Sequence, residues 1–161
     1  MSQLSVPVRK ALLAGCAALL LAGTPTAAAA APATPAALVV VPMNPEPAPA
    51  GGRTVVHAFV ANEGGSTAQN PFTVTVTLPR EVSAATPFFP ASCKPLPAGR
   101  TVSCTFAGGL GSGRTATALI PVVIPAGTPS GKLSGGRVAV AGPDASPDPA
   151  RSSAAFTITV G

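Results

Sequence analysis

Residues 72–78 read FTVTVTL, and this stretch carries the clearest structural signal in the chain. Three threonines alternate strictly with four apolar residues, which are Phe72, Val74, Val76 and Leu78. Because successive side chains of a β-strand point to opposite faces, strict alternation predicts a strand with one buried and one solvated face. The stretch therefore favours a fold built from sheets that each cover one side of a core.

Strand signals recur on both sides of this stretch. They lie at 38–41, 53–62, 100–106, 114–124, 137–141 and 155–160. Turn residues dominate the links between them, as in NEGGS, GGLGSG and GPDASPDP. Pro121 lies within one of the segments, and because proline cannot donate to a ladder it predicts a sheet edge or a bulge there. About seven short strands in about 120 residues are typical of an antiparallel β-sandwich.

Helices are not expected after the N-terminal segment. Twenty prolines and seventeen glycines are scattered through the chain and break most helical patterns. Aliphatic side chains and six phenylalanines must therefore build the core between the two sheets.

The order of these segments resembles a known family. Residues 55–79, VVHAFVANEGGSTAQNPFTVTVTLP, are followed by a VSC strand, GGLGSG, PVVIPAG and finally PDASPDPARSSAAFTITV. Over roughly 38–160 this order resembles the immunoglobulin-like repeat domains of bacterial extracellular and cell-surface proteins, including conserved repeat domains of unknown function and cell-adhesion-type domains. Arg151 and Ser152 stand where that family commonly has paired asparagines. The resemblance implies an all-β fold, an immunoglobulin-like antiparallel β-sandwich of about seven strands, acting as a spacer or adhesive module.

The N-terminal region has the plan of a secretory signal peptide. Arg9 and Lys10 precede an apolar run over 11–23, which is followed by small residues that a signal peptidase accepts. The run is too short to span a hydrocarbon core of about 30 Å. It also continues past Cys16, which argues against a lipid anchor at that cysteine.

Three regions follow from this reading. We expect a signal peptide over 1–30, a disordered Ala/Pro-rich linker over 31–37 and a β-sandwich domain over 38–161. The mature protein would then be secreted, free in the medium or associated with the cell wall, and without a membrane span.

Charge and aromatic content exclude one class of partner. After removal of the signal peptide, eight basic and five acidic side chains leave a net charge of about +3, without any basic run. Tryptophan and tyrosine are absent, so no aromatic platform is available for stacking bases. Nucleic-acid binding is therefore not expected.

Cys93 and Cys104 remain after signal removal, and an even number of cysteines in an exported chain predicts a disulfide. A hairpin centred on Ala98 and Gly99 would place them opposite each other. Pro95 and Pro97, which lie within the segment SCKPLPAGRTVSC at 92–104, would then occupy positions that need a backbone donor. We therefore expect a segment that is irregular or extended up to Pro97 and turns at PAGR before the strand of Cys104, held by the disulfide and not by regular ladder bonds.

Catalytic and metal sites find little support. His57 is the only histidine, and no G-x-S-x-G motif or C-x-x-C spacing accompanies it. Asp144 and Asp148 are weak calcium candidates, although an aspartate in such a loop more often forms an Asx turn. We expect a protein that is not an enzyme and needs no cofactor.

Two short stretches are candidate contact sites. Asn62 and Glu63 begin the polar loop NEGGSTAQN, which we place at one end of the sandwich. Phe88 and Phe89 form the only adjacent aromatic pair, so one ring is expected in the core and the other in an exposed apolar patch.

These observations predict a secreted, non-catalytic module for adhesion, spacing or protein interaction. Its partner would be a cell-wall or extracellular protein or glycan, and its edge strands would be the natural contact surface. Two alternatives stay open. One is a carrier of a small apolar ligand, and the other is an extracellular protease inhibitor that uses the loop over 94–103.

Overall fold

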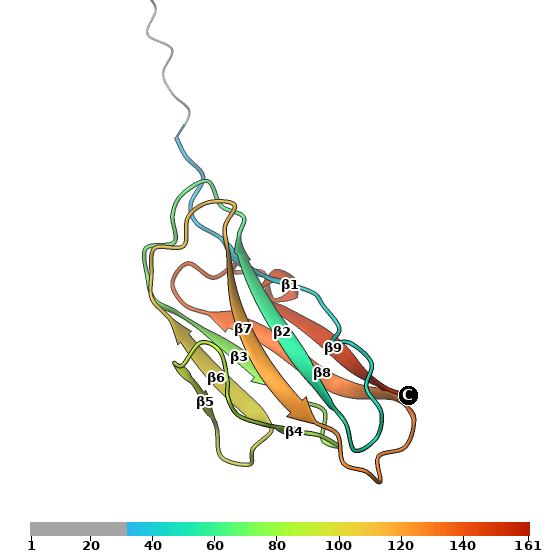
Figure 1. The fold of residues 1–161 in the computed structure, drawn as a ribbon. Coiled ribbons are helices and arrows are strands. Elements are labelled where there is room, and N and C mark those ends of the chain that lie inside the picture. Colours follow the sequence, from blue (N-terminus) through green and yellow to red (C-terminus); the bar gives the residue numbers. More distant parts are fainter. Residues whose placement is uncertain (1–31) are drawn as a thin grey trace, which may run out of the picture. The chain divides into compact units, whose positions relative to one another are not determined.

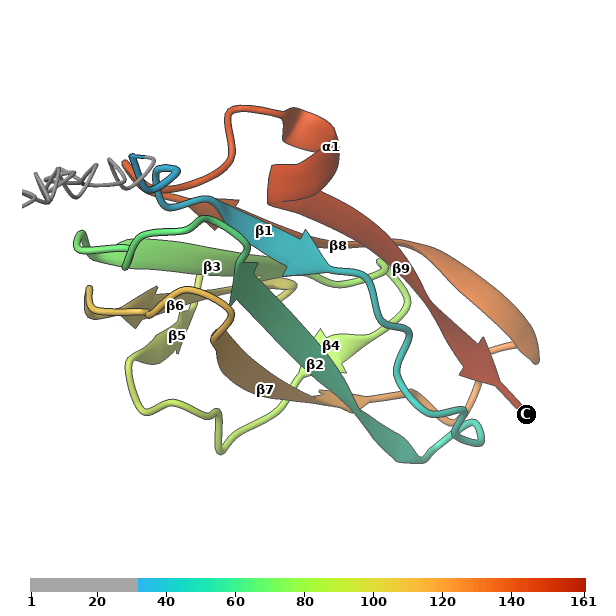
Figure 2. The ribbon, with the colours of Figure 1, turned by 90° about the horizontal axis from the view of Figure 1, so that it is seen from above.

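Two antiparallel sheets stack face to face in the computed structural model, which describes residues 32–161 (Figures 1 and 2). The expected signal peptide and Cys16 lie outside the described residues. Among residues 32–161, no helix has the length and hydrophobicity needed to cross a membrane.

The order of strands in the two sheets identifies the fold as an antiparallel β-sandwich. The four-stranded sheet runs β1 (Leu38–Val41), β2 (Arg53–Asn62), β7 (Thr115–Val123) and β4 (Ser83–Ala84). The five-stranded sheet runs β5 (Cys93–Pro95), β6 (Thr101–Phe106), β3 (Phe72–Thr77), β8 (Gly131–Ala141) and β9 (Ser153–Val160). The runs β1-β2-β7 and β6-β3-β8-β9 correspond to the A-B-E and C′-C-F-G orders of immunoglobulin-like sandwiches. The expected all-β sandwich is thereby confirmed.

Alternating residues of both sheets fill the core, as the sequence pattern predicted. Val74 and Val76 of β3 and Ile120 of β7 are fully buried and belong to the same core cluster between the sheets. The rings of Phe72 and Phe106 stack with their centroids 5.1 Å apart and extend this core toward one end. The core is therefore mainly aliphatic, with aromatic rings at its margin.

The structure adds elements that alternation alone could not indicate. Strand β8 begins at Gly131, whereas the sequence pattern predicted a start at residue 137. A bulge between Leu133 and Gly136 shifts the register and interrupts the alternation before that residue. Strands β4 and β5 have only two and three residues. The single-turn helix α1 (Pro149–Ser152) forms where no helix was expected.

The expectation that residues 92–104 lack a regular ladder is wrong. Cys93 lies opposite Cys104, and Pro95 lies opposite Val102 in a two-stranded ladder. Leu96 donates to the carbonyl of Thr101 at 2.7 Å, and donors of an antiparallel pair alternate between the two sides of a strand. The nitrogen of Pro95 therefore faces away from β6, where no donor is needed.

Pro121 does not lie at a sheet edge or in a bulge. It is within β7, which lies between β2 and β4. Leu119 donates to Phe89 at 2.8 Å on the β4 side, so the nitrogen of Pro121, two residues on, faces that side as well. The carbonyl of Pro121 accepts from Ala85 at 2.8 Å, and β4 has already ended at Ala84.

Thr34 and Ala37, within the expected linker, make hydrogen bonds to the loop that follows β2. Thr34 Oγ1 accepts a hydrogen bond from the Gly65 amide at 2.9 Å, and the Thr34 carbonyl accepts one from the Ser66 hydroxyl at 2.9 Å. The Ala37 carbonyl accepts from the Glu63 amide at 3.0 Å. The polar groups of the neighbouring loop thus find their partners in this segment.

Candidate functional site: an apolar sheet face

The outer faces of the two sheets differ in chemistry. The five-stranded sheet presents hydroxyl groups at consecutive outward positions of its central strands, namely Thr73, Thr75, Thr77, Thr101, Ser103 and Thr105. Such a face is typical of a strand pair that is solvated on one side.

The four-stranded sheet presents mainly apolar groups, with Thr115, Thr117 and Ser83 as its polar outward residues. In β2 the residues at 54, 56, 58, 60 and 62 are buried, so the residues between them point outward. The outward side chains of the sheet include Val41, Val55, His57, Phe59, Phe89, Leu119 and Pro121, which we call the apolar face.

Backbone register arranges the apolar face in rows across the strands. The central row runs from His57 to Leu119 and on to Phe89, because each of these residues lies opposite the next. One flanking row runs from Val41 to Phe59 and on to Thr117, and the other pairs Val55 with Pro121. The rings of His57 and Phe59 are 5.9 Å apart between centroids. Side chains in such rows touch their neighbours and form one continuous patch.

Phe89 is the most exposed large apolar side chain of this patch, at 58 % exposure. Its amide donates to the Leu119 carbonyl at 3.1 Å, and its carbonyl accepts from the Leu119 amide at 2.8 Å. Phe88 is half-buried and packs against the core. The structure therefore turns the two rings to opposite sides, and it places Phe89 beside residues that sequence analysis had not grouped with it.

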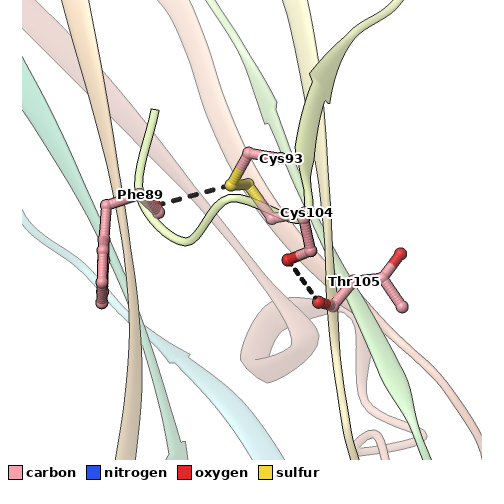
Figure 3. Close-up of a disulfide and its surroundings, with 5 residues drawn as sticks. Phe89, Cys93, Cys104 and Thr105 are labelled. Carbon is pink, nitrogen blue, oxygen red and sulfur yellow. Dashed lines mark hydrogen bonds between the residues drawn. A yellow bond between two sulfur atoms is a disulfide. The ribbon is translucent and has the colours of Figure 1, made fainter. Parts of the chain in front are cut away.

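A disulfide anchors the segment that carries Phe89 (Figure 3). Cys93 is bonded to Cys104, and its Sγ lies 3.4 Å from the Phe89 carbonyl oxygen. A disulfide sulfur carries no hydrogen, so this is a packing contact. The Cys93 amide also donates to the Pro90 carbonyl at 3.0 Å. The segment from Phe89 to Cys93 is thus tied to both sheets.

Charge is almost absent from the apolar face. Among the outward positions of β1, β2, β7 and β4, Arg53 is the one residue with a permanent charge, and it lies at the end of β2 opposite Val123. Continuous apolar surface is unusual on a monomeric soluble protein and marks interaction sites.

Asn62 is not available as a surface contact, contrary to the sequence-based expectation. Its side chain is fully buried. Its Oδ1 accepts hydrogen bonds from the amides of Ala37 and Gly64, both at 3.1 Å. Its Nδ2 donates to the carbonyls of Ser66 at 2.8 Å and Leu110 at 2.9 Å. Asn62 therefore holds three chain segments together inside the protein.

Glu63, the other candidate in this loop, is exposed. Its carboxylate forms an ion pair with Arg151, at the last turn of α1. Both side chains are about half exposed, so the pair contributes little to stability.

Asp144 and Asp148 have separate structural roles. Asp144 Oδ2 accepts from the backbone amide of Asn70 at 2.9 Å and from its side chain at 3.2 Å. Asp148 Oδ1 accepts from the Ala150 amide at 2.9 Å and caps α1. Within residues 32–161, no group of three or more histidine, cysteine, aspartate or glutamate side chains is placed to hold a metal ion.

The sheet edges offer less contact surface than expected. Strand β4 is very short, and β5 carries Pro95. The edge of β9 is covered by 44–48, where Asn44 Oδ1 accepts from Thr157 at 2.8 Å and Ala48 donates to Thr159 at 3.1 Å. These features leave little free edge at β4, β5 and β9, so the apolar face is the better contact candidate.

A pocket of about 500 Å³ opens at the end of the sandwich near the β5–β6 turn. Its lining includes Arg80, Glu81, Arg100 and Ser134. A hydrogen bond from Arg80 Nε to Glu81 at 2.9 Å holds the pKa of Glu81 below its ordinary value. This polar pocket does not match the apolar cleft that a carrier of an apolar ligand requires.

Comparison with known proteins gives distant likenesses. No protein-family model and no curated protein matches the chain. A type I cohesin from Pseudobacteroides cellulosolvens is 16% identical, with a TM-score of 0.45 over 78% of this chain and 92% of the cohesin. BcpA, the major pilin subunit of Bacillus cereus, is 12% identical, with a TM-score of 0.46 over 78% of this chain and 39% of the pilin. AvmM, which catalyses macrocyclization in alchivemycin A biosynthesis, is 14% identical, with a TM-score of 0.39 over 80% of this chain and 89% of AvmM. Likenesses at this level carry no information about what this chain binds.

Proposed function

We propose that this protein is a secreted, non-catalytic interaction module that binds another protein through the apolar face. The observation that carries the proposal is the contrast between the two sheets. The outer face of the five-stranded sheet carries threonine and serine on its central strands β3 and β6. The outer face of the other sheet carries a continuous apolar patch over β1, β2, β7 and the segment of Phe89, with Thr117 at its margin.

Burial of the apolar face would supply the free energy of binding. Removal of apolar surface from water contributes about 25 cal/mol per Å² before the costs of association. Phe89 is the natural anchor, because it is the most exposed aromatic side chain of the apolar face and aromatic anchors carry much of the energy of an interface, and Leu119 lies beside it. Their backbone hydrogen bonds hold both residues in place before a partner arrives.

The test compares two matched substitutions. Phe89→Asp places a carboxylate in the apolar face, and Thr75→Asp places one on the hydroxyl face of the other sheet. Each variant and the wild type would be used to capture partners from a culture of the source organism. Partners bound by wild type and Thr75→Asp but lost with Phe89→Asp support the proposal. Loss with Thr75→Asp and retention with Phe89→Asp would place the interaction on the opposite sheet.

A further inference from the structure

We propose that the apolar face also binds a second copy of the same chain, with a two-fold axis along the row His57–Leu119–Phe89. This inference rests on the proposed function of the face and names one partner for it. Three features support it: the symmetry of the rows, the position of the one permanent charge, and the area of the patch.

The rows allow the face to match itself. The central row is flanked on one side by Val41, Phe59 and Thr117, and on the other by Val55 and Pro121. A two-fold axis that lies between two copies along the central row exchanges the flanking rows. Phe59 of each copy then faces Val55 of the other, and Thr117 faces Pro121, so apolar groups meet apolar groups except at the Thr117 hydroxyl.

The same axis brings the central residues against themselves. Leu119 faces the second copy's Leu119, and Phe89 faces its counterpart as an aromatic pair. Aligned packing of two sheets is a common arrangement in β-proteins, with the faces about 10 Å apart.

The position of Arg53 favours this axis over a two-fold axis that runs along the strands. Arg53 lies four residues from His57 along β2, which is about 13 Å at the usual rise per residue. The proposed axis places the two Arg53 side chains at opposite ends, about 26 Å apart and about three Debye lengths at physiological salt. An axis along the strands would leave them only about 11 Å apart across the interface. The first arrangement avoids this repulsion.

The area of the patch sets the strength of the association. Strands β1, β2 and β7, the segment of Phe89 beside them and five residues of β2 cover roughly 20 Å by 20 Å, or about 400 Å² of flat area on each copy. Side-chain relief raises the accessible area, so the total lies near the roughly 1,000 Å² at which weak specific interfaces begin. We therefore expect a weak dimer whose population rises with protein concentration.

Sedimentation velocity tests the dimer on the protein purified with its disulfide formed. Wild type is measured from about 10 µM to about 1 mM, the range in which a weak interface of this size would populate. The sedimentation coefficient should rise with concentration. His57→Lys puts two ammonium groups together on the axis and should raise the dissociation constant at least about tenfold. Thr75→Lys adds the same charge to the other sheet and should leave the dimer unchanged.

The outcomes separate this inference from the proposed function. The dimer is refuted if wild type stays monomeric at every concentration measured. It is also refuted if His57→Lys and Thr75→Lys raise the dissociation constant equally. Thermal melting of each variant checks that it is folded, and Phe89→Asp provides a second substitution on the axis. If the protein is monomeric but still captures a partner through Phe89, only self-association is wrong. If it is monomeric and Phe89→Asp leaves capture unchanged, the proposed function is wrong too.

Discussion

Asn62→Ala should destabilise the protein more than any exposed polar substitution. The change removes four hydrogen bonds, to Ala37, Gly64, Ser66 and Leu110. At about 1 kcal/mol for each bond the loss is about 4 kcal/mol, and partial access of water to the loop groups reduces it to about 3 kcal/mol. The unfolding entropy of a domain of about 130 residues converts this into a fall in melting temperature of about 11 °C.

Urea unfolding and thermal melting measure this effect. Asn70→Ala is the matched control, because its amide bonds Asp144 at the exposed surface, and it should cost less than about 1 kcal/mol. Asn62→Asp keeps the acceptor but loses both donors, so it should be about as unstable as Asn62→Ala. A loss below about 1 kcal/mol for Asn62→Ala, or one equal to that of Asn70→Ala, would refute the structural role.

Two further predictions concern the disulfide and Glu81. Replacing both Cys93 and Cys104 with alanine should lower the free energy of unfolding by about 3 kcal/mol, because the bridge closes a loop of about 12 residues. Binding per folded molecule should survive, since the backbone bonds of Phe89 remain; loss of binding at unchanged stability would contradict this. Arg80→Ala should raise the pKa of Glu81 toward its ordinary 4.5 in an NMR titration. Because the pKa of Glu81 is lowered in the folded protein, its ionised carboxylate stabilises the fold at neutral pH. This contribution is lost as acid protonates Glu81, so the free energies of unfolding of wild type and Arg80→Ala should converge in acid. An unchanged pKa would mean that Arg80 does not hold this carboxylate.

Strict alternation predicted the strands that are apolar on one side only. FTVTVT and FTITV bury one face and expose threonine on the other, so their positions in the core follow directly from the sequence. The bulge near Gly136 breaks that period, and the three-residue β5 is too short to show one. These elements depend on pairing with strands that are distant in sequence.

The candidate site was only partly predictable, although the sequence contains a usable signal. Residues 53–62 and 114–124 are apolar at positions of both parities, unlike 72–78. A strand that is apolar on both sides is either buried on both or exposes an apolar face. Parity also places Asn62 with Val56 and Val60 on the buried side of β2. The sequence does not show which side of these strands the other sheet covers. It therefore could not decide whether their second apolar side is exposed, or whether Asn62 lies on the buried side.

Site-specific photo-cross-linking tests the apolar face most directly. A benzophenone amino acid would replace Phe89 in one variant and Thr75 in another, and both would be irradiated in a culture of the source organism. The account predicts covalent adducts from position 89, to a second copy or to another protein, and none from position 75. Adducts from position 75 alone would contradict the claim that the apolar face is the interaction surface.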